Sequence, residues 1–218
     1  SQRNPAIGSE ALQLFGLIPH DTSTTIRISR ADVFPLRELA AVTRPAAYER
    51  VDATSDAING YRALVEELYR DHAVVPAPFG TVFRSRDSLL HWMELHYSAL
   101  VDALGFVQDR AMARVHVAVV PLSPEALTES VEVRATDFET TVFDSFRFLK
   151  RSAVACVTFT PQVAPAGRSV EASFLVDREK WPLFEEAVAE ERRRLPELAI
   201  EQSGPFPAYD FVRLQFGA

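Results

Sequence analysis

The chain has one cysteine among its 218 residues, Cys156, and this excludes an intramolecular disulfide and a zinc site built on several thiolates of one chain. Because Cys156 lies between Ala155 and Val157 in an apolar run, its thiol is expected to pack as a small hydrophobe. No apolar stretch approaches the roughly 18 residues needed to span a bilayer, and the N-terminus lacks the basic and apolar segments of a secretory leader. We therefore expect a cytoplasmic protein that does not enter a membrane.

Glycine is also scarce, and the eight glycines are too dispersed to build a phosphate-binding loop. The sequence contains no G-x-S-x-G turn, no HExxH motif and no His-x-His pattern. His91 and His96 are five residues apart, about 140° around a helix, so they cannot share one face. Carboxylates such as Asp137 and Glu185 fall on predicted solvated helix surfaces rather than in a cleft. The sequence predicts a protein that is not an enzyme and needs no cofactor and no metal.

The chain also has no excess of basic residues: its formal net charge is −7 and its estimated pI is about 5.3. Phosphate contacts need clustered Lys and Arg, so this balance argues against nucleic acid or an anionic membrane as a partner. The one basic cluster, Arg192–Arg194, follows Glu185, Glu186 and Glu190 on the same predicted helix. Acidic residues early and basic residues late in a helix suit its dipole, which accounts for the cluster without a nucleic-acid site.

The hydrophobic content, 47%, is typical of a globular protein, and its periodicity predicts elements in the first half of the chain. The predicted elements are a strand at 11–18, extended segments at 25–29 and 38–43, a helix from Asp56 to before Pro76, and a helix from about Ser85 to Gly105. The last of these has a continuous apolar stripe from Leu89 to Leu104. We expect both helices to cover a sheet.

The second half of the chain shows the order β-α-β-β-α-β, which is the ferredoxin-like pattern. Its predicted elements are a strand at 112–120, a helix within 137–150, strands at 153–160 and 169–176, a helix at 179–195, and a strand at 198–203 continuing at 209–216. The segment 121–136 has no clear period. The predicted fold is therefore α+β, with an N-terminal α/β domain at 1–105 and a C-terminal ferredoxin-like domain at 106–218.

Two aromatic segments stiffened by proline stand out, at 76–83 and at 204–212. In the second, Pro205 and Pro207 each fix a φ angle and push the preceding residue towards extended geometry. In the first, two prolines end any incoming helix, and Gly80 permits a turn before the chain extends again. Both segments are architectural signals, because neither offers a nucleophile beside a base.

These two segments carry a resemblance to a known family. The phrase GPFPAYDFV at 204–212 resembles GPWPPYSFV of the gas vesicle protein L / gas vesicle protein F (GvpL/GvpF) family, and PFGTVF at 78–83 is similar to the family's LRFGTVF. Pro78 stands where the family has arginine and Phe206 where it has tryptophan, so the chain resembles a divergent member. The resemblance implies a non-enzymatic accessory protein for gas vesicle assembly. Its implied partners are the hydrophobic gas vesicle shell protein and other accessory proteins, either in the cytoplasm or at the gas vesicle.

Phe206, Tyr209 and Phe211 are the candidate partner-binding residues, because neighbouring prolines leave little conformational freedom to lose on binding. The alternative for these aromatics is that they only pin a terminal strand to the fold. A rival function is a ferredoxin-like small-molecule or haem-binding enzyme with its ligand between sheet and helices, attached through His116. A third is a relative retained as an interaction module in an organism without gas vesicles.

Overall fold

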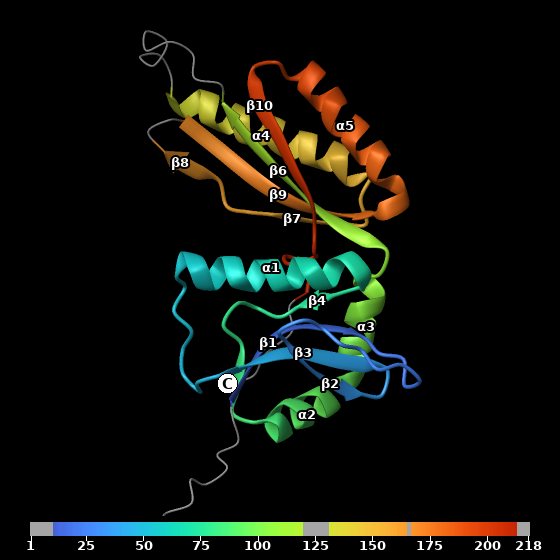
Figure 1. The fold of residues 1–218 in the computed structure, drawn as a ribbon. Coiled ribbons are helices and arrows are strands. Elements are labelled where there is room, and N and C mark those ends of the chain that lie inside the picture. The colour runs from blue at the N-terminus through green and yellow to red at the C-terminus, as the bar shows by residue number, and fades with distance from the viewer. Residues whose placement is uncertain (1–10, 120–130, 165–166, 213–218) are drawn as a thin grey trace, which may run out of the picture. The chain divides into compact units, whose positions relative to one another are not determined.

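The structure, a computed structural model, describes residues 11–119, 131–164 and 167–212 (Figure 1). The chain divides into two compact units. The first unit runs up to Gln108 and takes in the C-terminal segment from Pro207, whereas the second unit is Asp109–Phe206. The predicted division at 105/106 placed the C-terminal segment with the second half instead. Whether each unit folds as an independent domain stays a prediction.

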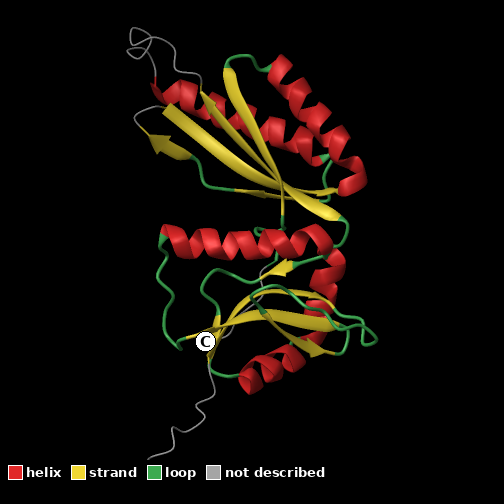
Figure 2. Cartoon of the chain, in the orientation of Figure 1, coloured by secondary structure: helices red, strands yellow, loops and turns green. Residues whose placement is uncertain are grey.

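The first unit contains a five-stranded antiparallel sheet in the order β2-β3-β1-β4, with β5 also paired to β1. Its strands are β1 Ala11–Pro19, β2 Asp32–Leu36, β3 Leu39–Ala46, β4 Val75–Pro76 and β5 Val82–Phe83. Its helices are α1 Ser55–Asp71, α2 Arg86–Leu95 and α3 Tyr97–Val107. Figure 2 shows α1 on one side of this sheet and α2 on the other. The strand predicted at 11–18 is confirmed as β1, and the segment predicted at 38–43 is confirmed as β3.

Helix α1 shows why this sequence folds as it does locally. The Oγ1 of Thr54 accepts a hydrogen bond from the N–H of Ala57 at 3.2 Å and so caps the first turn. The buried side chains recur at helical spacing: Tyr61, Leu64, Val65 and Leu68. They pack against residues of β1 and β3 in one core cluster, so the predicted helix is confirmed.

The long helix predicted from Ser85 to Gly105 is two helices. The apolar stripe continues through both helices, but the helix is interrupted at His96, which is the C-cap of α2 and the N-cap of α3. The ring nitrogen Nδ1 of His96 lies 2.9 Å from the carbonyl of Trp92, and its own backbone N–H also reaches the Trp92 carbonyl, at 3.1 Å. The apolar period therefore predicted the buried face correctly, but it did not predict the interruption at His96.

The second unit contains a second five-stranded antiparallel sheet in the order β10-β6-β9-β7, with short β8 paired to β9. Its strands are β6 Arg110–Val119, β7 Ala155–Thr158, β8 Gln162–Ala164, β9 Gly167–Asp177 and β10 Leu198–Phe206. Its helices are α4 Val131–Lys150, the single turn η2 Arg178–Lys180 and α5 Trp181–Arg194. The predicted α+β class is confirmed. The element order of this unit follows the ferredoxin-like pattern, with β8 as an addition.

Helices α4 and α5 cover one face of this second sheet, and Figure 1 shows the two side by side on it. Aromatic rings join the layers: Phe174 of β9 lies with its ring centroid 5.8 Å from that of Phe146 on α4 and 5.2 Å from that of Phe184 on α5. All three side chains are buried. These aromatic residues of α4, β9 and α5 therefore belong to the core of the second unit.

The strand predicted at 209–216 is wrong where the structure describes it. Strand β10 ends at Phe206, and the chain then turns, with the N–H of Tyr209 donating to the carbonyl of Pro207 and the N–H of Phe211 to that of Ala208. Two hydrogen bonds within so few residues hold the backbone in turns rather than in an extended strand. Residues 213–216 lie outside the described part of the chain.

Glu191 on α5 is a buried carboxylate, with 2% of its side chain exposed. It accepts hydrogen bonds from the Nε and Nη2 atoms of Arg194 at 2.8 and 2.6 Å. Burial alone would raise the pKa of Glu191, but the hydrogen bonds and charge of Arg194 and the hydroxyl of Ser145 outweigh it, so its pKa is lowered from the usual 4.5. The ionised form therefore stabilises the second unit.

Glu191→Gln is expected to lower the free energy of unfolding at pH 7 by about 1 kcal/mol, because Arg194 is half exposed and retains water as a partner. A lowered folded pKa contributes stability that is present above the unfolded pKa and lost as the pH falls through the folded pKa. The variant should therefore show a shallower loss of stability between about pH 5 and pH 3 than the wild type. Urea denaturation across this range measures both effects.

The matched control is Glu186→Gln on the same helix. Glu186 also pairs with an arginine, Arg193, at 3.1 Å, but its side chain is 70% exposed. Exposed pairs contribute little, so this variant should follow the wild type at every pH. Equal pH profiles for Glu191→Gln and the wild type would contradict the role assigned to Glu191.

Candidate partner-binding site

The two proline-rich aromatic segments meet at one side chain of the first unit, Tyr61 of α1. The ring centroid of Phe79, from the first segment, lies 5.7 Å from that of Tyr61 in an edge-on arrangement. The ring of Tyr209, from the second segment, lies 6.2 Å from it. Phe15 of β1 adds a stacked ring at 6.0 Å. We call these four residues the Tyr61 cluster, in which aromatic contact joins segments that are far apart in the sequence.

The hydroxyl of Tyr61 ties the cluster to the first segment directly, since it donates a short hydrogen bond to the carbonyl of Ala77. Burial raises the pKa of Tyr61 to about 12, against a small opposing effect of Arg62. The phenol therefore stays protonated at physiological pH and keeps its hydrogen bond. Tyr61 fixes the backbone of the 76–83 segment while its ring supports Tyr209.

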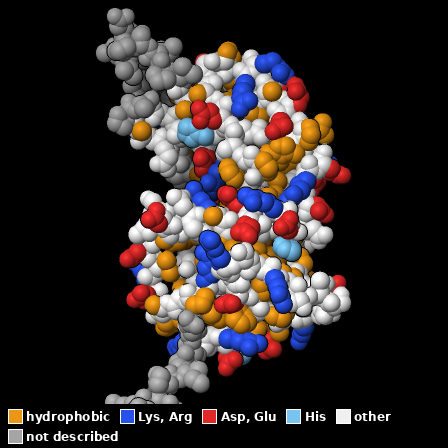
Figure 3. Space-filling model, viewed as in Figure 1, with side chains coloured by type: hydrophobic (Ala, Val, Ile, Leu, Met, Phe, Trp, Pro, Cys, Tyr) orange, Lys and Arg blue, Asp and Glu red, His pale blue; other side chains and the backbone are white. Residues whose placement is uncertain are grey.

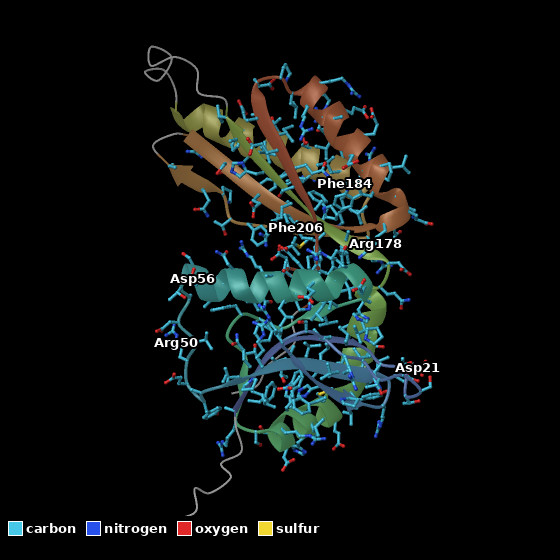
Figure 4. The ribbon with its side chains drawn as sticks, viewed as in Figure 1. Asp21, Arg50, Asp56, Arg178, Phe184 and Phe206 are labelled. Carbon is cyan, nitrogen blue, oxygen red and sulfur yellow. The ribbon has the colours of Figure 1, made fainter. Side chains whose placement is uncertain are left out.

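The structure places the three predicted partner-binding residues on both units. Phe206 is the last residue of β10, opposite Met112 of β6, in the second unit. It is one of the residues labelled in Figure 4. Tyr209 and Phe211 lie in the turns that follow and belong to the first unit. All three side chains are half-buried. Tyr209 is brought into the Tyr61 cluster, and part of each of the three side chains is left at the surface.

Tyr61 itself was not predicted as a site residue. Its position in the apolar stripe of α1 is that of an ordinary core residue, and only the contacts with Phe79 and Tyr209 distinguish it. A buried tyrosine must find a hydrogen-bond partner for its hydroxyl, and this requirement is the signal that could have drawn attention to it.

His116 does not lie where the haem or small-molecule alternative needs it. Its neighbours on β6, Val115 and Val117, are buried in the core cluster beneath the helices, so alternation along the strand turns His116 to the opposite face. There it is flanked by Glu171 of β9 and Glu201 of β10. The helix-facing side of the sheet is filled by packed side chains. The predicted placement of a ligand between the sheet and the helices, attached through His116, is therefore wrong.

Cys156 of β7 packs against the same core cluster. Burial raises the pKa of its thiol, although the Thr158 side chain and the charge of Lys150 act in the opposite direction. A thiol with a raised pKa is a poor nucleophile, so Cys156 suits packing rather than chemistry.

Similarity to known proteins shows which family the chain belongs to. The chain matches the family "Gas vesicle synthesis protein GvpL/GvpF" over residues 12–142 and 125–213. The chain belongs to the GvpL/GvpF family. This membership confirms the resemblance carried by the two aromatic segments and supports a role in gas vesicle assembly.

Relatives of this GvpL/GvpF chain include two proteins of Halobacterium salinarum. Gas vesicle protein F1 is 28% identical over 170 residues, which are 78% of this chain and 74% of the relative. Gas vesicle protein F2 is 26% identical over 216 residues, 95% of this chain and 94% of the relative. The alignment with F2 therefore includes both units.

Two crystal structures of GvpF share the fold. That of the Anabaena sp. PCC7120 protein superposes with a TM-score of 0.74, with 15% identity over 94% of this chain and 99% of that one. That of the Microcystis aeruginosa protein gives a TM-score of 0.70, with 14% identity over 94% of this chain and all (100%) of that one. The α+β architecture of this GvpL/GvpF member is therefore that of solved family structures.

Charged side chains of both signs are present on the surface of this GvpL/GvpF member. Figure 3 shows Lys and Arg side chains interspersed with Asp and Glu on the visible face. Within the described ranges, no group of three or more His, Cys, Asp or Glu residues could hold a metal ion. Among the helices that the structure describes, none is both long enough and apolar enough to cross a membrane. Independence from metals and cofactors stays a prediction.

Proposed function

We propose that this protein is a non-enzymatic accessory factor that binds the hydrophobic gas vesicle shell protein in the cytoplasm and holds it until it joins the vesicle wall. The observation that carries the proposal is membership of the GvpL/GvpF family across both units. A shell subunit whose apolar face will line a gas space must be kept from aggregating beforehand. A partner with a net charge of −7 stays soluble while it covers that face.

Phe206, Tyr209 and Phe211 are the residues we assign to partner contact. Each is half-buried, so the fold holds the ring while leaving part of it exposed. The ring of Tyr61 packs against that of Tyr209 and restricts its side chain. Less conformational entropy is therefore lost when a partner binds. Other gas vesicle accessory proteins are the second class of partner for these residues, whereas nucleic acid and membranes are not partners in this proposal.

The test is to dilute purified shell subunit from denaturant into buffer with and without this protein, and to follow aggregation by light scattering. The wild type is expected to bind the subunit and slow its aggregation. Phe211→Ala should bind about ten-fold or more weakly, because buried aromatic residues dominate interfaces. Tyr48→Ala is the control, since Tyr48 is also an aromatic residue of the first unit and is 62% exposed.

Two results would contradict parts of this proposal separately. A wild-type protein that neither binds the shell subunit nor slows its aggregation would contradict the function. Equal binding by the wild type, Phe211→Ala and Tyr48→Ala would contradict the assignment of Phe211 to the contact surface.

A further inference from the structure

One edge of the second sheet is built from two short strands, β7 and β8. Both pair with β9, and the sheet order ends there, so one side of their backbone lies at the end of the sheet. Among the described residues, no further strand pairs with that side. An open edge of this kind is a template on which an extended segment of another chain can add as a strand.

This edge carries none of the charges with which proteins usually protect an edge strand. Between Arg151 and Arg168 the sequence contains no Asp, Glu, Lys or Arg. Three apolar side chains along it are exposed: Val154 by 41%, Phe159 by 37% and Val163 by 74%. Edge strands are normally guarded by charged side chains, by Pro or by covering elements, and here Pro161 between the two strands is the only such device within the described part of the edge.

The backbone of β7 is oriented for strand addition. The N–H of Phe159, just beyond β7, donates to the carbonyl of Glu171 on β9 at 2.9 Å. Successive residues of an antiparallel pair turn their N–H and C=O groups alternately towards and away from the partner strand. The groups of Thr158 and Cys156 are therefore directed to the open side, where an added strand would meet them.

The opposite edge of the same sheet, β10, is different. The Nε of Arg192 donates to the backbone carbonyl of Ile200 at 2.8 Å and so occupies one acceptor of that strand. Glu201 adds an exposed charge, and Pro205 has no N–H to offer. Of the two edges, only the β7–β8 edge is both uncharged and uncapped in the described residues.

We propose that the β7–β8 edge binds an uncharged, apolar extended segment of the shell subunit by strand addition. This inference rests on the proposed function for the choice of partner. Charge supports it, because an uncharged segment can cover this edge without burying an unpaired charge on either side. A second copy of this chain is the less suitable occupant, since two copies each with a net charge of −7 repel one another.

The experiment uses the full chain, purified shell subunit and three variants. Val163→Lys places a charge on the edge at a side chain that is 74% exposed, so folding is not at risk. Val163→Thr keeps a β-branched, uncharged residue. Leu183→Lys is the matched control, because Leu183 is 64% exposed and lies on helix α5 of the same unit rather than on the β7–β8 edge. Val163→Lys should weaken binding about ten-fold or more, whereas the other two should bind within about two-fold of the wild type.

Hydrogen exchange separates strand addition from side-chain docking alone. In the complex, exchange at the N–H groups of Cys156 and Thr158 should slow about ten-fold or more relative to the free protein, because each acquires a backbone partner. Equal binding by the wild type and Val163→Lys, or unchanged exchange at these amides, would overturn the inference while leaving the function in place. A wild-type dimer that Val163→Lys dissociates would also overturn it, because the occupant would be a second copy. Failure of the wild type to bind at all would instead contradict the function.

Discussion

Gly204→Ala is expected to lower the free energy of unfolding of the second unit by about 3–5 kcal/mol. Gly204 has a φ of +123°, which side chains of L-residues rarely adopt. An added Cβ would lie 2.7 Å from the carbonyl oxygen of Met112 and 3.4 Å from the Cα of Ala113. Both atoms are backbone of β6, which pairs on both sides and cannot move aside without disturbing the sheet.

The measurement needs a probe of the second unit alone, because two units need not unfold together. The chain has two tryptophans, and Trp181 is in the second unit, 3.2 Å from the position of the added Cβ, whereas Trp92 is in the first. In a Trp92→Phe background, urea denaturation followed by fluorescence therefore reports the second unit. Gly204→Ala should unfold at clearly lower urea, and an unchanged midpoint would contradict the prediction.

Gly60→Ala is the control for the substitution itself. Gly60 lies within α1, and nothing comes within 4 Å of the Cβ that alanine would add. Because glycine in a helix costs about 0.5–1 kcal/mol relative to alanine, this variant should stabilise the first unit by that amount. Fluorescence of Trp92 in a Trp181→Phe background measures it. Opposite signs for the two substitutions would show that the local backbone, and not loss of glycine, decides the effect.

The sequence alone was sufficient to predict an element where its apolar period, or a proline that ends it, decides the local structure. Strand β1 ends at Pro19 as predicted, and α1 follows its apolar period from Tyr61 to Leu68. Strands β6, β7, β9 and β10 and helix α5 of the second unit also follow from strand and helix periods, whereas β8 was not predicted and α4 begins within the segment 121–136, which has no clear period. In these cases the information lies within a few residues of the element, which is the range over which periodicity acts.

The sequence was insufficient where distant contacts decide. Strand β2 at Asp32–Leu36 was not predicted. It contains Pro35, which is tolerated because β2 is at the edge of the sheet and pairs with β3 alone. The strand predicted at 209–216 is wrong at Tyr209 and Phe211, whose backbone N–H groups form turn hydrogen bonds. The candidate site was found only in part: Tyr209 was identified, and its support by Tyr61, 148 positions away in the sequence (209 minus 61), has no local signature.

Tyr61→Ala is expected to lower the free energy of unfolding of the first unit by about 3–5 kcal/mol, the usual cost of truncating a large buried aromatic residue. Tyr61 is 7% exposed and contacts the rings of Phe15, Phe79 and Tyr209. Its loss removes the ring that the two family segments share. Denaturation followed by Trp92 fluorescence in a Trp181→Phe background measures the effect, and faster hydrogen exchange at the Phe211 amide would report release of the 207–212 segment.

Tyr61→Phe separates the ring from the hydroxyl. It keeps the aromatic contacts and removes only the hydrogen bond to the Ala77 carbonyl, so a loss of about 1–2 kcal/mol is expected. Because the pKa of Tyr61 is raised to about 12, the hydroxyl does not titrate between about pH 6 and pH 9, and this loss should be the same throughout that range. If Tyr61→Ala and Tyr61→Phe were equally destabilised, the hydroxyl alone would hold the first segment and the Tyr61 cluster would have no role in supporting Tyr209. If Phe211 exchange rises only in Tyr61→Ala, the ring contacts are what position the predicted partner-binding aromatics.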